Sequence, residues 1–554
     1  MSPLKPRISL SLVSHTNAGK TTLARTLLGR DVGEVRDAPH VTEFADVFTM
    51  IDTPQGESLQ LWDTPGFGDS LRLVKRLQAS GNPIGWFLSQ VWDRWRDRPF
   101  WATQQALRNV RDEADVMLYL VNAAEQPAAA GYVAAEMELL AWVDKPVIVL
   151  LNQLGAPRAA AFEADDLTRW REHLAPHAQV RAVLPMDAFA RCWVQEFTLL
   201  RAIESALTDE SQARMARLRE AWAMRRWVTF DAAMHSVAHS LARLASDTEP
   251  LPEAGNLRSR LRSLGAAIGG GLGIGNAAQT SAAVAQQALA QRLDAELRAN
   301  TAELIHLHDL AGQAEAEIRA RLTTHYEMRL RLDEGKAALW GGAVTGALAG
   351  LKADILSGGL TMGGGLLAGG LLGALGAAGL ARCVNLVRGT DRAWLAWNAQ
   401  ALDQMVEAAL LRYLAVAHFG RGRGEWALGE SPPHWKEVID NALASQRAAI
   451  AAIWAGRDTH DSEGIDLQSQ QQLGALLEPI LRRAGLAALQ LLYPDIAELH
   501  ERPDADPDWV ASTTEVLPTR HQKDDNGDIN DPAALPRGSE SRPTSGISRP
   551  HENI

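Results

Sequence analysis

The feature of this chain that most constrains its fold is a short glycine-containing loop near the start. The loop, SHTNAGKT at residues 14–21, follows the apolar run Ile8–Val13 and precedes the helix-like segment Thr22–Leu28. A strand, a tight loop ending in Gly-Lys-Thr and a helix are the layout of a phosphate-binding P-loop. In this layout, successive backbone N–H groups surround an anionic phosphate at the start of the helix. The segment therefore predicts a nucleotide-binding α/β domain.

The residue types in the loop match the chemistry of a nucleotide phosphate and its metal ion. Gly19 lets the backbone come close to the phosphate, and Lys20 reaches the β- and γ-phosphate oxygens as a point charge. The Thr21 hydroxyl is the predicted Mg²⁺ ligand. Ser14 stands where the pattern usually has its first glycine. The predicted phosphate-binding residues are Asn17, Ala18, Gly19, Lys20, Thr21 and Thr22.

A second motif follows a predicted strand at Leu59–Trp62. It reads Asp63-Thr64-Pro65-Gly66, in which Asp63 is expected to complete the Mg²⁺ shell and the Gly66 N–H to sense the γ-phosphate. A similar string at residues 52–55 lacks the glycine and is interpreted as part of the preceding hairpin. Thr42, just before the predicted strand Phe44–Met50, is the candidate switch threonine that closes on Mg²⁺. The alternative for Thr42 is an ordinary strand residue.

These motifs resemble those of the Era-type and dynamin-like branch of the translation-factor-related GTPases. That group typically shows Gly-x-x-Asn-x-Gly-Lys-Ser/Thr and Asp-Thr-Pro-Gly. Here Asn17 matches the Asn of the first motif, and Asp63–Gly66 match the second motif in full. The resemblance covers about residues 5–205. The resemblance implies a switch that binds GTP and GDP with Mg²⁺ and hydrolyses GTP, with Lys20, Thr42 and Gly66 in the catalytic site. More closely, the chain resembles proteobacterial GTPases that join such a domain to a long helical domain of unknown function. The segment LRYLAVAHFGRG at residues 411–422 is characteristic of that second domain.

The predicted base-recognition segment departs from the family pattern Asn-Lys-x-Asp, whose Asp accepts two hydrogen bonds from guanine. After the buried strand Val147–Leu151, Asn152 is kept, but Gln153 replaces the Lys and Gly155 replaces the Asp. Loss of the carboxylate predicts weaker selection for guanine, because charge-assisted hydrogen bonds are the strong ones. Asp187 follows the predicted strand Val180–Leu184, where the last base-contacting loop is expected, and is the candidate substitute acid. Loose purine selectivity stays open.

The residue after Gly66 also departs from the Ras-type pattern. It is Phe67, which cannot orient a water molecule as a glutamine does. The resemblance then implies slow intrinsic turnover, with activation by a partner, by a nucleotide-dependent homodimer or by a monovalent cation. Asn17 occupies the position that helps to bind K⁺ in cation-activated relatives, so K⁺ is a further candidate cofactor.

The composition limits the classes of partner and compartment. The net charge of −12 is unfavourable for general nucleic-acid binding, so nucleic acid is not an expected partner. Two cysteines far apart in the sequence, Cys192 and Cys383, suggest a reducing compartment. No signal-peptide pattern fits between Met1 and the first strand. The expected location is the cytoplasm, with association with the inner membrane as an open alternative.

The pattern along the chain predicts two domains and a tail. Alternating strands and helices over residues 1–205 predict an α/β P-loop domain with a mostly parallel sheet flanked by helices. Residues 206–500 carry long helical periods and predict an all-α domain, with helices at Ser211–Ser246, Ala277–Arg331 and Arg392–Ala417. His306 and His308, two residues apart on one of these helices, face different sides and predict no metal site. The tail, residues 501–554, is poor in large apolar residues and is predicted to be disordered.

A tryptophan-rich insertion occupies residues 67–115, after the Asp-Thr-Pro-Gly motif. The favoured interpretation is two helices whose tryptophans pack on the core, because tryptophans at helical spacing are usually core residues. The alternative is an effector or membrane-interface element that moves with the switch region. The tryptophans concerned are Trp86, Trp92, Trp95 and Trp101.

An apolar segment at residues 337–381 interrupts the polar helical pattern. Its second part, Ile355–Ala381, carries no charge over a length that can span a bilayer, with basic residues on both flanks. This favours a membrane hairpin and a lipid partner, whereas its many glycines favour a buried glycine- and alanine-rich hairpin. The two interpretations are balanced. The glycine- and arginine-rich Gly420–Gly424 is either an anion-binding loop or a basic linker.

The motifs together predict a GTPase switch joined to a helical domain that is either soluble or membrane-associated. Two other functions stay open at this point: a nucleotide-binding membrane scaffold with little turnover, and an RNA-linked GTPase like many Era-type relatives. The acidic balance of the chain is unfavourable for the RNA-linked alternative.

Overall fold

The computed structural model of the chain describes most of the predicted nucleotide domain and a large part of the helical region. The described residues lie in one compact unit, residues 1–504. Several sequence predictions concern segments outside the described residues: Thr42, Gly155, residues 337–381, Gly420–Gly424 and residues 501–554. The described residues are 6–29, 45–78, 87–88, 98–154, 160–188, 192–250, 277–310, 384–388, 393–419, 434–457 and 467–500.

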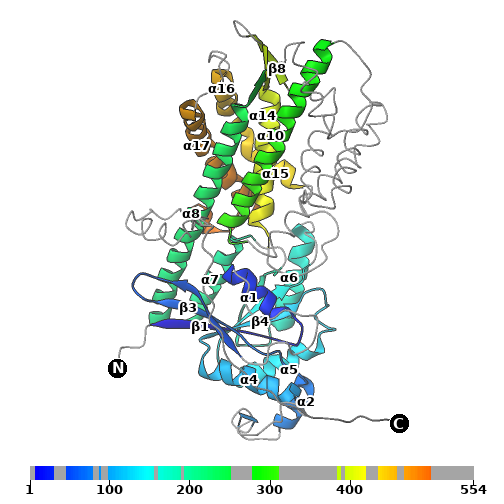
Figure 1. Cartoon of the computed structure of the whole chain (residues 1–554). Helices are drawn as coiled ribbons and strands as arrows, with labels where there is room; N and C mark the ends of the chain where they lie inside the picture. Colours follow the sequence, from blue (N-terminus) through cyan, green and yellow to red (C-terminus); the bar gives the residue numbers. More distant parts are fainter. Residues whose placement is uncertain are drawn as a thin grey trace, which may run out of the picture. The chain divides into compact units, whose positions relative to one another are not determined.

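A six-stranded sheet organises the N-terminal part of the chain (Figure 1). Its order is β2-β3-β1-β4-β5-β6, in which β2 is antiparallel to β3 and every other neighbouring pair is parallel. This confirms the predicted mostly parallel α/β fold and the six predicted strands, with β2 starting at Asp46. The strands are β1 (Arg7–Ser14), β2 (Asp46–Asp52), β3 (Ser58–Asp63), β4 (Val116–Asn122), β5 (Val147–Asn152) and β6 (Val180–Pro185).

The central strands are buried on both faces, which explains why they read as continuous apolar runs. In β4, Val116, Leu118 and Leu120 enter one core, and the alternate residues Met117 and Tyr119 enter the core on the other face. The string at residues 52–55 forms the β2–β3 turn, where Thr53 N donates to the Glu57 carbonyl at 2.9 Å, as the hairpin interpretation predicted.

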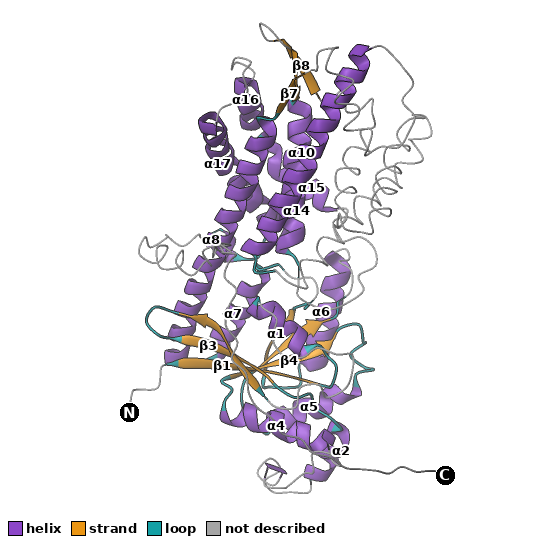
Figure 2. Cartoon of the chain, in the orientation of Figure 1, coloured by secondary structure: helices purple, strands orange, loops and turns teal. Residues whose placement is uncertain are grey.

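Helices cover both faces of the sheet (Figures 1 and 2). Leu23 and Leu27 of α1 and Phe197 of α7 pack into one core, and Val133 of α5 and Trp170 of α6 pack into the other. The helices are α1 (Lys20–Leu28), α2 (Ser70–Leu77), α4 (Arg98–Asp112), α5 (Gly131–Ala141), α6 (Ala160–Leu174) and α7 (Gln195–Ala206).

The tryptophan-rich insertion contains two of these helices, α2 and α4. The buried face of α4 includes Phe100, Leu107 and Val110, whereas Trp101 is only half-buried. Trp86, Trp92 and Trp95 lie outside the described residues, so the predicted packing of those tryptophans is not tested.

Long helices follow the sheet domain (Figure 2). α8 confirms the predicted helix Ser211–Ser246, and its buried side includes Trp222, Trp227 and Phe230. Among the residues that the structure describes, no helix combines the length and apolar character needed to cross a bilayer. The helices are α8 (Asp209–Ala245), α10 (Ala277–Leu307), α14 (Ala399–Ala417), α15 (His434–Ala444), α16 (Arg447–Arg457) and α17 (Leu467–Leu492), with a 3₁₀ turn η1 at Ala497–Leu499.

A small antiparallel sheet in this region corrects one sequence prediction, and the end of α10 corrects another. Its strands, in the order β7-β9-β8, are β7 (Thr248–Pro250), β8 (Val384–Arg388) and β9 (Ala393–Trp397), so the helix predicted from Arg392 is wrong over its first residues. β9 pairs with a strand on each side, and this pairing overrides the helical spacing of its two tryptophans. The helix α14 begins only after Asn398, whose side chain caps it by accepting a hydrogen bond from Ala401 N at 2.8 Å. α10 also stops at Leu307, where Asp309 adopts a left-handed φ of 55°, short of the predicted Arg331.

The core on the α1 side of the sheet continues without interruption into the core of the helices. Aromatic side chains form the junction. Trp193, which precedes α7, lies 5.6 Å from Trp227 of α8 between ring centroids and donates its Nε1–H to Tyr413 of α14 at 3.4 Å. At the β2–β3 turn, Arg217 of α8 also donates to the Glu57 carboxylate. The helices are therefore packed on the nucleotide domain.

The two histidines near the end of α10 differ in environment. His306 lies on α10 but His308 follows its last residue, so the prediction that one helix carries both is wrong for His308. His306 is exposed, whereas His308 is buried and its Nδ1 lies 2.8 Å from the Leu304 carbonyl oxygen. Burial lowers the pKa of His308 from 6.5 to about 4, against the opposing effect of that hydrogen bond. His308 is therefore neutral in the folded protein at neutral pH.

We predict an acid-dependent loss of stability from His308. Between pH 6.5 and about 4 the unfolded histidine binds a proton that folded His308 does not, so the free energy of unfolding falls as the pH falls. His308→Leu should remove about 3 kcal/mol of this loss, measured by urea denaturation across that range. His306→Leu is the matched control and should leave the slope unchanged. Identical slopes for His308→Leu and wild type would contradict the assignment.

Candidate functional site

The loop between β1 and α1 has a backbone that only particular residues accept. Asn17 and Gly19 adopt left-handed φ angles of 67° and 90°, and α1 begins at Lys20. Asn is among the few non-glycine residues that adopt this conformation readily. A Cβ on Gly19 would lie 2.7 Å from the Asn152 side-chain nitrogen, so this glycine permits a close approach between the loop and the end of β5. The amides at the start of α1 therefore have the arrangement of an anion site.

Lys20 is buried at the start of α1, and its ammonium donates to the Ser14 hydroxyl at 2.9 Å. Ser14, the residue that departs from the usual glycine, thus contacts the lysine and donates its own hydroxyl to the His15 carbonyl oxygen at 2.6 Å. Burial lowers the pKa of Lys20 to about 8, while the nearby charges of Asp63 and Glu136 oppose that shift. A buried ammonium with a lowered pKa gains energy from an anionic ligand.

Thr21 and Asp63 meet through a hydrogen bond from the Thr21 hydroxyl to Asp63 Oδ2 at 2.5 Å. Asp63 comes from the end of β3, and burial raises the pKa of its carboxyl to about 6, against the Thr21 hydrogen bond and the Lys20 charge. The other carboxylate oxygen, Oδ1, is buried and has no hydrogen-bond partner among the described residues. A hydroxyl and a carboxylate with an unpartnered oxygen are the oxygen ligands that Mg²⁺ prefers, so these two residues fit the ion.

The segment after Asp63 pairs with the P-loop backbone. Phe67 N donates to the Ser14 carbonyl at 2.8 Å, and Thr16 N donates to the Phe67 carbonyl at 3.2 Å. A Cβ on Gly66 would lie 2.9 Å from Thr16 Cα and 3.1 Å from the Lys20 ammonium, so only glycine fits there without a shift. The Phe67 side chain is fully buried in the core.

Asn152, the last residue of β5, connects the P-loop to the loop that follows β6. Its side-chain nitrogen donates to the Ala18 carbonyl at 2.8 Å, and its oxygen accepts from Ala188 N at 2.9 Å. Asp187, the residue before Ala188, accepts from Leu154 N through Oδ2 at 2.8 Å. The predicted base-site residues Asn152 and Asp187 are therefore close to each other and to the P-loop.

A buried carboxylate next to the P-loop was missed in the sequence. Glu136 of α5 is fully buried and accepts hydrogen bonds from Ser70 Oγ at 2.7 Å and Tyr119 O–H at 2.6 Å, and it lies 2.7 Å from His15 Nδ1. His15 also stacks on Tyr132 at 4.4 Å between ring centroids. Glu136 thus joins the P-loop to the start of α2. The only signal in the sequence was a Glu between the apolar residues Ala135 and Met137 of α5, which does not reveal its partners.

The first part of the chain matches a family model described as a 50S ribosome-binding GTPase, over residues 9–153. Residues 9–153 form a P-loop GTPase domain. A curated relative of this GTPase domain, GTPase Era of Heliobacterium modesticaldum (strain ATCC 51547 / Ice1), is 23% identical over 145 residues. The match covers 26% of this chain and 39% of that relative, so the chain spans about two-fifths of the relative's length.

Two solved Era structures overlap with the chain in part. Era in complex with MgGDPNP and a segment of 16S ribosomal RNA is 18% identical with a TM-score of 0.28, covering 37% of this chain and 58% of that chain. A variant of Aquifex aeolicus Era bound to GDP·AlF4⁻ is 16% identical with a TM-score of 0.28, covering 53% and 90%. The overlap at these TM-scores is too low to carry an argument about the GTPase domain.

The structure brings most of the predicted site residues together at one edge of the sheet. Lys20, Thr21, Asp63 and Gly66 lie around the start of α1, and Asn152 and Asp187 lie beside the loop that holds Asn17 and Ala18. Thr22 is buried on α1. Thr42 lies outside the described residues, so its predicted role stays a prediction.

We predict that Glu136 stabilises the GTPase domain beside the P-loop. Glu136→Ala would leave the buried Ser70 and Tyr119 hydroxyls without their acceptor and should lower the free energy of unfolding by about 2–5 kcal/mol. The effect is measured by urea denaturation of the nucleotide-free chain. Glu138→Ala, on the same helix but with an exposed hydrogen bond to Gln78, is the control and should cost less than about 0.5 kcal/mol. Equal losses in the two variants would contradict the role of Glu136.

Proposed function

We propose that this chain binds GTP and GDP with Mg²⁺, hydrolyses GTP slowly, and acts as a nucleotide switch for its helical part. The observation that carries the proposal is the convergence of Lys20, Thr21, Asp63 and Gly66 at the start of α1. A buried cation, a hydroxyl–carboxylate pair and a close-packed glycine are the groups that a Mg²⁺-bound triphosphate needs.

In the proposed mechanism, the chain positions the phosphates and counters their charge. The backbone amides of residues 17–22 hold the phosphate oxygens, and the Lys20 ammonium exchanges its Ser14 hydrogen bond for a contact with the β- and γ-phosphates. Thr21 and Asp63 would hold Mg²⁺, which would neutralise negative charge on the phosphate oxygens. The Gly66 amide would contact the γ-phosphate, and Thr42 is the proposed further ligand of the metal.

The proposed hydrolysis is slow because the residue after Gly66 cannot orient the attacking water. That residue, Phe67, is buried in the core and carries no polar group on its side chain. We propose that a partner, a nucleotide-dependent homodimer or K⁺ bound near the exposed Asn17 completes the site. Equal turnover in K⁺ and Na⁺ would contradict the K⁺ part of this proposal.

Coupling to the helical part is supported by two contacts between the GTPase domain and the long helices. Glu57, in the turn of the hairpin that enters β3 and leads to Asp63, pairs with Arg217 of α8. Trp193, five residues after Ala188, packs against Trp227 and Tyr413 of the helices. We propose that a change at the nucleotide site reaches α8 through β3 and Glu57, and α8 or α14 through Trp193.

Beyond guanine nucleotide, we propose membrane lipid as a partner of this chain. The apolar segment 337–381 supports contact with membrane lipid. The alternative function is a nucleotide-binding membrane scaffold with little turnover. Phosphate release, measured with and without lipid vesicles, separates a GTPase switch from such a scaffold. One of the two Era structures is a complex of that protein with 16S ribosomal RNA. The net charge of −12 is unfavourable for general binding to RNA. Salt-sensitive RNA binding would support the RNA-linked alternative instead.

We predict that Lys20→Ala weakens GTP binding by at least about 30-fold, because it removes a buried charge that pairs with phosphate. The measurement is calorimetric titration of GTP, GDP and ATP with Mg²⁺ on the full chain. Lys436→Ala, which removes an exposed lysine on α15, is the matched control and should bind as wild type does.

Guanine-selective binding that Lys20→Ala weakens would support the switch. Equal binding of ATP would place the chain in a purine-tolerant class. Unchanged binding in Lys20→Ala would overturn the proposed phosphate site.

We predict that Asp187 supplies the carboxylate that Gly155 lacks. Asp187→Asn keeps an acceptor for the Leu154 amide but loses the charge, so the preference for GTP over ATP should fall by about 10- to 100-fold. The preference is the ratio of the two calorimetric dissociation constants. Asp144→Asn, at an exposed turn before β5, is the control. An unchanged ratio in Asp187→Asn would assign base recognition to other groups.

A further inference from the structure

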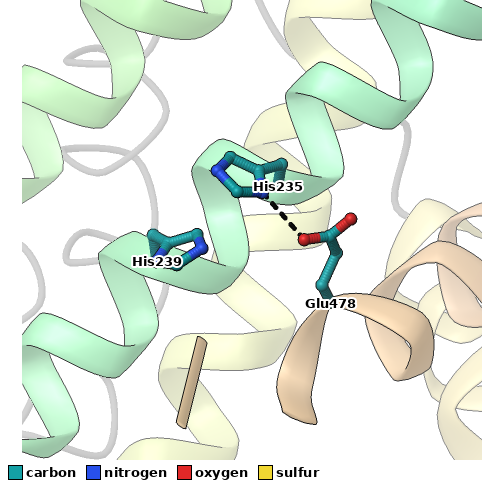
Figure 3. Close-up of side chains that lie close together, drawn as sticks. All are labelled: His235, His239 and Glu478. Atoms are coloured by element: carbon teal, nitrogen blue, oxygen red, sulfur yellow. Dashed lines mark hydrogen bonds and ion pairs between the residues drawn. The ribbon is translucent and has the colours of Figure 1, made fainter. Parts of the chain in front are cut away.

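Two histidines on α8 face a glutamate on α17 (Figure 3), and none of the three belongs to the proposed nucleotide site. His235 and His239 are four residues apart and therefore lie one above the other on the same face of the helix. Glu478 comes from a helix that is more than two hundred residues away in the sequence. The two helices pack directly against each other, so the three side chains meet only in the fold.

The geometry of the three side chains is close to that of a metal site. One ligand atom from each residue lies within 4.8 Å of the other two. His235 Nδ1 is 2.8 Å from Glu478 Oε2, and the two imidazole centroids are 4.2 Å apart. Ligands of one tetrahedral Zn²⁺ lie roughly 3.3 Å apart, since each is about 2.0–2.2 Å from the ion. Small rotations of side chains at the surface therefore suffice to close the site.

Neighbouring residues hold two of the ligands in place. A Cβ on Gly474 would lie 2.6 Å from His239 Nδ1, so this glycine makes room for the imidazole against α17. Arg482 contacts the second oxygen of Glu478 at 3.1 Å and pairs with Asp231 of α8 at 3.0 Å. Such outer contacts orient a ligating carboxylate. Among the described residues, this is the one group of His, Cys, Asp and Glu side chains with metal-ligand spacing.

We propose that His235, His239 and Glu478 bind a divalent transition-metal ion of the Zn²⁺ class. Two imidazole nitrogens and one carboxylate oxygen are ligands that suit Zn²⁺, whereas Mg²⁺ prefers oxygen ligands alone. The His235 side chain is 59% exposed, so water completes the coordination shell. Binding replaces the His235–Glu478 hydrogen bond with two metal bonds and releases any proton that the pair shares.

The bound ion links α8 to α17. Because it contacts both helices only when they are packed together, it stabilises the folded helical part and not the unfolded chain. The inference is independent of the proposed GTPase function, since none of its residues lies in the nucleotide site.

The test is Zn²⁺ titration of the full, nucleotide-free chain without an affinity tag, in excess Mg²⁺ that occupies oxygen-ligand sites. Wild type should bind one Zn²⁺ per chain, and His235→Ala, His239→Ala and Glu478→Gln should each weaken that binding by about tenfold or more. Gly474→Ala, which keeps all three ligands but displaces His239, should weaken it as well. His306→Ala, which removes an exposed histidine on α10, is the matched control and should bind as wild type does.

Two further readouts separate a metal site from a surface hydrogen bond. Co²⁺ in place of Zn²⁺ should give visible absorption in wild type that His239→Ala lacks. Zn²⁺ should raise the denaturation midpoint of wild type but not of His239→Ala, while circular dichroism verifies that the variant is folded. Absence of stoichiometric Zn²⁺ binding to wild type, or wild-type affinity in the His235→Ala and His239→Ala variants, would overturn the site.

Discussion

The parallel pairing of β1 with β3 is the interaction on which the nucleotide site depends. The register places Leu12 opposite Asp63, the last residue of β3, and β1 ends two residues later at Ser14, so the following loops meet. The pairing continues past the strands, where Phe67 and the P-loop exchange backbone hydrogen bonds. Because the carboxyl ends of parallel strands lie at one edge of a sheet, Asp63 reaches Thr21 although they are 42 residues apart. A slip of one residue would turn Asp63 to the other face and separate the pair.

The groups at this edge are held in electrostatic environments that favour a ligand. Burial lowers the pKa of Lys20 and raises the pKa of Asp63, which means that both charges are unfavourable in the folded, ligand-free site. An anion beside Lys20 and a cation beside Asp63 would relieve both effects. Glu136 adds a third buried polar group, whose hydrogen bonds with Ser70 and Tyr119 fix the surroundings of the loop. The buried charges thus destabilise the ligand-free site, whereas the apolar side chains of the two cores stabilise the domain around it.

The helical part shares its core with one face of the sheet. The aromatic junction of Trp193, Trp227 and Tyr413 begins just after the loop that holds Asp187, and Thr26 of α1 also donates to the Ala188 carbonyl at 2.8 Å. The nucleotide loops and the long helices therefore belong to one packed structure. This arrangement gives a physical route by which events in the GTPase domain can act on α8 and α14, and by which a metal between α8 and α17 can stabilise the same helices.

The sequence by itself determined the class of fold and most of the phosphate site. The apolar runs on both sides of Gly-Lys-Thr and before Asp63 sufficed for this prediction. The strand, the loop and the helix follow each other directly in the chain, and few residue types suit the loop. Only the tertiary structure decided the remainder. Glu136, the burial that shifts the pKa values of Lys20 and Asp63, and the approach of Glu478 to His235 all depend on segments far apart in the chain. The strand β9 was misread as helix for the same reason, since its partners β7 and β8 are not evident from its own residues. Local pattern specifies an element, whereas long-range packing specifies its neighbours and hence its chemistry.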